Sequence, residues 1–496
     1  MRRIVPVTAG IVAVGLAALV TASNTNAPDT AKRFTLVYNV NNAGYIDVCG
    51  CKHKEVRQGS ITRRASFLKQ LRAAKPEILL LDGGSSLFPI EDRVKDPERV
   101  EAIRKAELIV EAYNRMGYRA MAVGSFDLAA GLDTLQSLAQ KAKFEILSAN
   151  LLDKATQAPI FKPHAVLEVA GVRVGVIGLT LETMSRAYLG KVAPGVVVSD
   201  PIEAATRSVE ELRGKVDLLI ALSHVKQETN FQMISKLKEL EIVVDPFIEY
   251  GNPKTWIDQD AWLSFRDDTL FLRSDGQGAR MGVVDVTVIQ SRKTLVQEDR
   301  LKELEEAMAA GKATAEEKAE LEKARGKNLI KFERISLEPH HRTDPDMDRL
   351  IEEWKKNIDP SKVAHLEAEL PRKADFLTVE KCKSCHPKQY DNWKQTKHSQ
   401  AMASLATTGD QHRYDCVGCH SLGYGEAFLN TTKIGAFADV QCESCHGTNA
   451  KHADDPKQFK FSKVARSDCI VCHNKEQTRA EFNFVEAKPK VQCPKG

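Results

Sequence analysis

Eight of the eleven cysteines in this 496-residue chain occur in four copies of one pattern, Cys-x-x-Cys-His. The copies are Cys382, Cys385 and His386; Cys416, Cys419 and His420; Cys442, Cys445 and His446; and Cys469, Cys472 and His473. Two thiols at this spacing can bond to the two vinyl groups on one edge of a porphyrin, and the following histidine can ligate the iron. Zinc sites also use Cys-x-x-Cys pairs, but zinc does not require a histidine after every second cysteine. The pattern predicts four covalently bound heme c groups.

Each iron needs a sixth ligand if it is to be a low-spin electron carrier. Beyond residue 380 the sequence has three histidines outside the motifs, namely His398, His412 and His452. We expect these three to be distal iron ligands. Four irons need eight axial ligands, and the motif histidines together with these three supply seven. Either one heme is therefore five-coordinate, or the eighth ligand is Met402, His365 or a histidine from another chain.

The segment that carries the motifs, residues 381–484, has few aliphatic runs and many glycine and polar residues. Such a segment cannot bury enough apolar surface to fold alone, so we expect the porphyrins to supply its core. The predicted tetraheme domain is mostly α-helical and irregular.

Two stretches of this domain resemble the cytochrome c-554 family. Residues 382–401 are similar to its first heme segment, and residues 440–452 are similar to its third. The second heme of that family commonly lacks a distal ligand, which implies an open iron on His420.

The same resemblance implies a pairing of the distal histidines. His398 would cap the heme of His446, and His452 would cap the heme of His473. The family usually caps its first heme from between the second and third motifs, where residues 421–441 contain no histidine. His412 is the substitute that we expect there.

The N-terminal part, residues 33–296, has the periodic pattern of a sheet domain. An amphipathic helix is predicted at 60–74, and strands are predicted at 34–41, 77–82, 120–123, 144–149, 172–179 and 217–223. Helical stretches lie between most of these strands, which indicates an α/β or α+β fold.

The landmarks of this domain resemble the 5′-nucleotidase branch of the calcineurin-like metallophosphoesterases. The likeness rests, in order, on residues 78–84, 116–124, 147–150, 174–179 and 222–224. It implies a four-layer α/β/β/α sandwich, so the whole chain is expected to be of the α+β class.

That family holds two metal ions through Asp, His and Asn side chains, because two cations activate water and neutralise the phosphate. Most positions where those ligands belong carry other residues here, and only His224 is retained. The replaced positions are Asn42-Ala43-Gly44, Gly84-Ser85, Gly124-Ser125-Phe126 and residues 249–252. We therefore expect a scaffold without phosphoesterase activity.

The remaining segments have simpler interpretations. Residues 1–22, with Arg2, Arg3 and a short apolar run, are typical of a secretory signal peptide. Residues 297–380 are expected to form a helical hairpin and a linker. Three cysteines lie outside the motifs, namely Cys49, Cys51 and Cys493. Cys49 and Cys51, followed by His53, could bind a metal or carry redox chemistry; one disulfide to Cys493 and one free thiol is the simpler interpretation.

These observations predict an exported electron carrier, periplasmic or extracellular, rather than an enzyme. Its partners would be redox proteins, and a homo-oligomer or filament could supply a missing histidine. A formal net charge of +4 gives no reason to expect nucleic acid, and the mature chain has no predicted membrane span. The alternative is a heme redox enzyme that acts on a small nitrogen or oxygen compound at an open iron.

Overall fold

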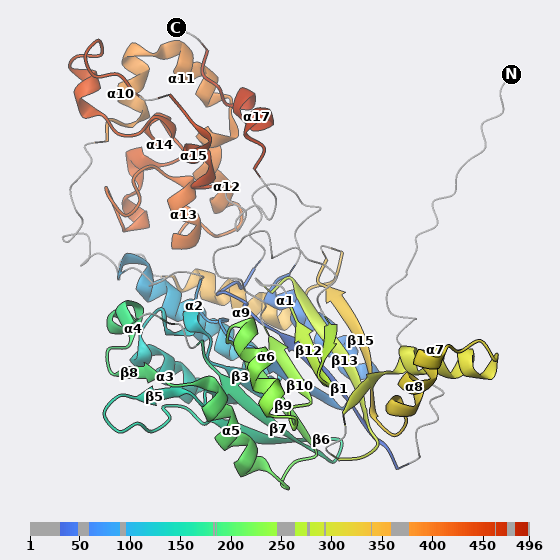
Figure 1. The fold of residues 1–496 in the computed structure, drawn as a ribbon. Helices are drawn as coiled ribbons and strands as arrows, with labels where there is room; N and C mark the ends of the chain where they lie inside the picture. Colours follow the sequence, from blue (N-terminus) through green and yellow to red (C-terminus); the bar gives the residue numbers. More distant parts are fainter. Residues whose placement is uncertain are drawn as a thin grey trace, which may run out of the picture.

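A computed structural model of the chain shows an α/β body with a mostly helical C-terminal part beside it (Figure 1). The residues that it describes are 30–47, 59–89, 96–181, 184, 186–245, 263–274, 278–291, 294–338, 340–358, 376–461, 463–473 and 482–494. The predicted signal peptide, Cys49, Cys51, His53, residues 249–252 and His365 lie outside these ranges.

The first sheet of the body has seven strands in the order β14-β15-β13-β1-β2-β3-β4. The central strand β1 pairs parallel with β2 and antiparallel with β13. The strands are β1 Lys32–Asn39, β2 Ile78–Asp82, β3 Ala120–Ala122, β4 Glu145–Leu147, β13 Arg280–Val288, β14 Leu295–Gln297 and β15 Asn328–Ser336.

The second sheet has six strands in the order β11-β12-β10-β9-β7-β6. These are β6 His164–Val169, β7 Val172–Leu179, β9 Leu218–Ser223, β10 Ile242–Asp245, β11 Leu263–Arg266 and β12 Thr269–Arg273. A further pair, β5 Leu151–Asp153 and β8 Val196–Val198, forms a small separate ribbon. The strands predicted from the sequence correspond to β1, β2, β3, β4, β7 and β9, with ends that differ by at most two residues.

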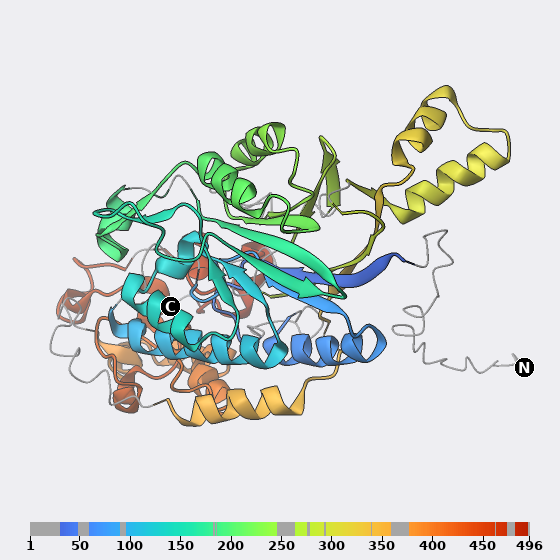
Figure 2. The same ribbon diagram turned by 90° about the horizontal axis from the view of Figure 1, so that it is seen from below.

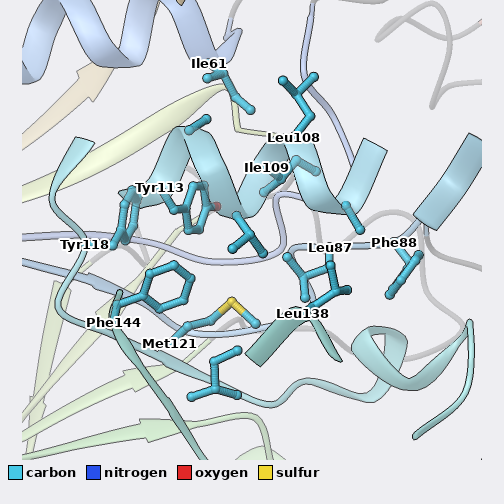
Figure 3. Close-up of a cluster of buried hydrophobic side chains, with 14 of the residues drawn as sticks. Ile61, Leu87, Phe88, Leu108, Ile109, Tyr113, Tyr118, Met121, Leu138 and Phe144 are labelled. Carbon is cyan, nitrogen blue, oxygen red and sulfur yellow. The ribbon is translucent and has the colours of Figure 1, made fainter. Parts of the chain in front are cut away.

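Three apolar layers show how the sheets stack. One cluster joins alternate residues of the two sheets, such as Leu36 of β1 and Val174 of β7. A second lies between the other face of the first sheet and helices α1 Ile61–Ala74, α2 Asp96–Met116, α3 Leu132–Lys141 and α9 Pro345–Lys356 (Figures 2 and 3). A third lies between the second sheet and helices α5 Pro201–Leu212 and α6 Gln227–Lys236. The body is therefore the four-layer α/β/β/α sandwich that was predicted.

The end of the body lies later in the chain than residue 296. Strand β15 pairs with β13 from Arg280 with Ser336 to Thr287 with Leu329, so it belongs to the first sheet. Helix α9 buries Met347, Ile351 and Trp354 in the same cluster as α1 and α2. The segment 297–380 is thus more than a hairpin and linker, although the hairpin itself is present as α7 Glu298–Ala309 and α8 Ala315–Ala324.

The C-terminal part is built from short helices and turns, as expected. Its apolar clusters are small, and the larger one centres on Leu405, Val417 and Phe428. The α-helices are α10 Thr378–Cys385, α11 Pro387–Lys394, α12 Ala401–Ala406, α13 Tyr414–His420, α14 Cys442–His446, α15 Arg466–Ile470 and α17 Phe484–Ala487; α4 Arg186–Val192 completes the body. Among the described residues, none of the helices is both long and apolar enough to cross a bilayer.

Candidate functional site

All four Cys-x-x-Cys-His motifs lie on short helices or at their ends. The first motif lies at the end of α10, and the second forms the end of α13. The third makes up the whole of α14, and the fourth begins in α15. Residues three apart share one face of a helical turn, so a helical motif allows its two thiols to reach one porphyrin edge. The backbone N–H of His386 donates to Cys382 O (2.9 Å), and that of His473 donates to Cys469 O (2.8 Å), which keeps each histidine beside its cysteines.

These motifs surround one large cavity of about 2320 Å³. Its lining includes all four motif histidines, His398, His452 and every motif cysteine except Cys385. His412 does not line it. The motifs, which are far apart in sequence, are thus arranged around a shared space rather than in four separate sites.

Two pairs of histidine rings face each other across this cavity. The ring centroids of His386 and His452 are 6.1 Å apart with an interplanar angle of 19°, and those of His398 and His473 are 6.1 Å apart at 34°. An imidazole binds a metal at about 2 Å from its nitrogen, and each ring adds about 1 Å from nitrogen to centroid, so one metal between two rings needs roughly 6 Å. The observed spacing fits an iron held between two histidines.

These ring contacts differ from the pairing implied by the family resemblance, and which iron each distal histidine caps stays a prediction. His398 was expected opposite His446 and His452 opposite His473, whereas the structure places His398 opposite His473 and His452 opposite His386. The difference arises because distal ligands approach from other helices, and that approach depends on how the helices pack. The ligands opposite His420 and His446 stay predictions.

Hydrogen bonds orient several of these rings. Nδ1 of His420 lies 2.7 Å from Ala401 O, and Nδ1 of His452 lies 2.6 Å from Phe459 O. A carbonyl can only accept, so each Nδ1 carries the proton and Nε2 is left to bind a metal. His412 Nδ1 lies 2.8 Å from the Thr431 hydroxyl. These contacts fit iron ligation at His420 and His452.

Two motifs are in direct contact. The sulfur atoms of Cys382 and Cys442, from the first and third motifs, lie within hydrogen-bonding distance of each other. Porphyrins attached at these positions would have neighbouring edges. Met402, the alternative iron ligand, instead packs against the cluster of Leu405, Val417 and Phe428.

The second candidate site lies in the body, at the carboxyl ends of β2 and β9. His224 follows β9 and is buried, and burial lowers its pKa to about 4. Its Nε2 lies 2.9 Å from Ser85 Oγ and 3.3 Å from Asn41 Oδ1. Asn41 thus faces His224, whereas the sequence predicted that Asn42 occupies the first metal-ligand position of the family. The Asn42 amide oxygen instead accepts a hydrogen bond from Arg64 Nη2 (2.7 Å).

The loop after β2 is held by Asp127, which sequence reasoning did not single out. Its carboxylate accepts the backbone N–H groups of Ser85 (2.7 Å), Ser86 (2.8 Å), Leu87 (2.9 Å) and Gly124 (2.9 Å). Four donors on one buried carboxylate fix the loop and the neighbouring turn that carries Ser125 and Phe126. The sequence signal for this role was the position of Asp127, an acidic residue directly after Gly124-Ser125-Phe126, where the family has its Gly-Asn-His element.

A buried polar cluster lies beneath this loop, between β2 and α2. Arg64 donates to the hydroxyls of Tyr113 and Tyr118 (3.2 Å each), whose rings are stacked with centroids 3.9 Å apart. Tyr113 donates to Asp82 (2.7 Å). Figure 3 shows these two tyrosines within the apolar layer under α2. In sequence, Arg64 looks like an ordinary exposed helix residue, so nothing signalled its burial.

These residues do not fit a two-metal centre. Within the described ranges, no group of three or more His, Cys, Asp or Glu side chains could hold a metal ion. The positions identified from the sequence present the Ser85 hydroxyl, Ser125 and Phe126, with His224 as the retained ligand. No metal-dependent step is therefore derived from this centre.

Comparison with known proteins identifies both parts of the chain. Residues 381–447 match the family model described as cytochrome c554 and c-prime. The N-terminal region is homologous to 5′-nucleotidases: it is 32% identical to the Vibrio cholerae enzyme over 173 residues, which is 34% of this chain and 30% of that protein. The human 5′-nucleotidase is 29% identical over 217 residues, 42% of this chain and 36% of that protein. The matches thus span about a third of these relatives.

Solved structures similar to the chain include a 5′-nucleotidase precursor from Thermus thermophilus, with 18% identity and a TM-score of 0.48. The match covers 69% of this chain and 61% of that one. The sequence similarity to 5′-nucleotidases corrects one expectation: the chain had been predicted to be an electron carrier rather than an enzyme, without phosphoesterase activity. Its body is homologous to enzymes, and this relationship points to an enzymatic activity.

Proposed function

We propose that the chain is a tetraheme c-type cytochrome in which electron transfer accompanies an enzymatic N-terminal domain, since it joins a segment of the cytochrome c554 family to a body homologous to 5′-nucleotidases. The observation that carries the heme assignment is the pair of histidine couples, each with centroids 6.1 Å apart, on one cavity lined by the four motifs. The cofactors are four heme c groups.

Each bound heme would supply a one-electron couple at its iron. The protein's own part is to hold the four groups around one cavity. The motif thiols anchor them covalently, and the bonds from Nδ1 of His420 and His452 to backbone carbonyls leave Nε2 free to ligate. The contact between Cys382 and Cys442 supports neighbouring porphyrin edges, which suits a relay of electrons through the domain.

A compartment outside the cytoplasm suits this chemistry, and we propose a periplasmic or extracellular location on the basis of the signal peptide predicted at residues 1–22. The partners are redox proteins. An open iron on His420 would in addition allow the domain to act on a small nitrogen or oxygen compound, and a second copy of the chain in a homo-oligomer or filament could cap that iron.

The heme load tests the central proposal. The full chain, produced in a host that attaches hemes, is treated with acid–acetone and its intact mass is measured. Covalent hemes add about 616 Da each, so four should add roughly 2.5 kDa. Replacing Cys382 and Cys385 with alanine should remove one heme from this total. Retention of two or fewer hemes by the unaltered chain would contradict the assignment.

A second role is favoured by the similarity to 5′-nucleotidases, namely hydrolysis of a phosphate ester by the body. The holoprotein is assayed for phosphate release from a panel of nucleotides and simpler phosphate monoesters. We expect turnover that falls in His224→Ala. His224 is the last residue of the motif 222–224 that resembles the 5′-nucleotidases, and it lies at the carboxyl ends of β2 and β9. His164→Ala, a change at a half-buried histidine of the edge strand β6, is the matched control. An activity that survives His224→Ala would place the reaction elsewhere.

A further inference from the structure

Helix α2 of the body makes close polar contacts with the second heme motif. The backbone N–H of Tyr414 donates to Glu101 (2.6 Å), and Lys105 forms an ion pair with Asp415 (3.1 Å). Glu101 and Lys105 are both buried, at 6% and 9% exposure. Asp415 immediately precedes Cys416, so α2 contacts the backbone at the attachment point of the second heme.

A second helix of the body extends these contacts. Lys355 of α9 pairs with Asp410 (3.1 Å), and Arg413 bridges Asp410 (3.1 Å) and Asp415 (2.8 Å). The Arg413 guanidinium also lies over the ring of Trp354, 5.8 Å from its centroid. Figure 1 shows α13 above α2, in agreement with these contacts. The network is a continuous chain of alternating charges that joins the two parts of the protein.

The network also faces the heme cavity. Lys105 and Asp415 both belong to its lining, together with Cys416, Cys419 and His420. Charges on the wall of a site from which a porphyrin excludes water act through a lower effective dielectric than charges in solvent, so their interaction with a nearby iron is stronger. A unit of positive charge there favours the ferrous iron, and a unit of negative charge favours the ferric iron.

We propose that Lys105 is a positioning residue of the body that, through Asp415, sets the reduction potential of the heme attached at Cys416 and Cys419. The inference rests on the proposed function, because it requires a heme at this motif. It gives the body a direct electrostatic influence on one of the four hemes. A change in the body that moves α2 would then change the potential of that heme.

The test uses opposite charge changes on the two partners of one ion pair. Lys105→Gln should shift one of the four one-electron waves to lower potential, because a positive charge is lost. Asp415→Asn should shift the same wave to higher potential, and the double variant should lie close to the wild type. Lys105→Arg should retain the wild-type potential. The measurement is a spectroelectrochemical titration of the holoprotein with its thermal unfolding recorded in parallel.

A matched control comes from the same helix. Arg115 of α2 forms an exposed ion pair with Glu111 (2.8 Å) and does not line the cavity, so Arg115→Gln should leave all four waves in place. Shifts of the same sign in Lys105→Gln and Asp415→Asn, or unchanged waves in both, would overturn the inference. Fewer than four waves in the wild type would instead contradict the proposed function, so the two failures are distinguishable.

Discussion

At the level of single residues, the attachment cysteines were predictable and the distal histidines were only partly so. Cys-x-x-Cys-His is a local signature, since both thiols and the proximal histidine lie within five consecutive residues. A distal histidine comes from elsewhere in the fold, and its partner depends on helix packing. His398 was therefore found as a candidate, but its position opposite His473 required the structure.

Removing a distal histidine should open one iron. In His398→Ala the iron of His473 loses its expected second ligand, and in His452→Ala the iron of His386 does. In each variant, the share of the total heme that binds CO after dithionite reduction should increase by an amount equal to about one quarter of the total heme, since one iron in four becomes accessible. Soret difference spectra measure this share. His340→Ala, an exposed histidine outside the cavity, should leave it unchanged, and an equally unchanged share in His398→Ala would show that the pairing is wrong.

His224 should make the body sensitive to acid. Burial holds its pKa near 4 in the folded chain, against about 6.5 when unfolded. Between these values the unfolded chain binds a proton that the folded chain does not, so this contribution to stability is present above pH 6.5 and is lost as the pH falls towards 4. The total loss is on the order of 3 kcal/mol.

Urea unfolding at several pH values checks this expectation. His224→Gln cannot take up the proton, so its free energy of unfolding should decrease less between pH 6.5 and pH 4 than that of the wild type. His340→Gln, which alters an exposed histidine, should follow the wild type. Parallel curves for His224→Gln and the wild type would show that another group governs the acid response.

At the level of secondary structure, strands with local signals were found and those defined by distant partners were not. Strands β2 and β7 are rich in Val, Ile and Leu, and β1 has the apolar residues Phe34, Leu36, Val37 and Tyr38, which predict buried strands directly. Strand β15 has mixed charges and follows the helical hairpin, so it was assigned to a linker. Its identity as a strand comes from its pairing with β13, about 40 residues earlier.

Helix α9 depends on its N-cap, and breaking that cap should weaken the body. The Asp344 side chain accepts the backbone N–H groups of Asp346 (3.0 Å) and Met347 (3.1 Å). Asp344→Ala leaves both donors without this acceptor and should lower the free energy of unfolding by about 1 kcal/mol. Chemical denaturation measures the loss. Asp344→Asn keeps an oxygen at the cap and should recover most of it; equal losses in both variants would point to the ion pair with Lys69 instead.

For the whole molecule, the two parts differ in what holds them together. The body has three extensive apolar layers, whereas the described C-terminal residues have two small clusters around a cavity of about 2320 Å³. Composition alone predicted this contrast, because residues 381–484 are poor in aliphatic runs. The arrangement of the motifs around one shared cavity was not predictable, since it depends on tertiary contacts.

Without hemes, the C-terminal part should lose its structure while the body keeps its own. The chain is produced in a strain that cannot attach heme, and amide hydrogen exchange is compared with that of the holoprotein. Protection should fall across α10 to α15 and persist in β1, β2 and β9, since the apolar layers of the body are formed by its own strands and helices. Unchanged protection across α10 to α15 would show that the domain folds without its cofactors.

The position of β1 has a consequence for how the chain is made. This strand is the first of the body to emerge, whether from the ribosome or from an export channel, yet one of its two edges is filled by β13, which emerges about 250 residues later. Until then β1 can pair only with β2, and its other row of N–H and C=O groups has no partner. The first sheet therefore completes late, after a long interval in which the open edge of a strand with Phe, Leu, Val and Tyr side chains can meet wrong partners. A chain that emerges in this order is protected either by rapid emergence through residue 288 or by a chaperone that covers the open edge of β1 until β13 pairs with it.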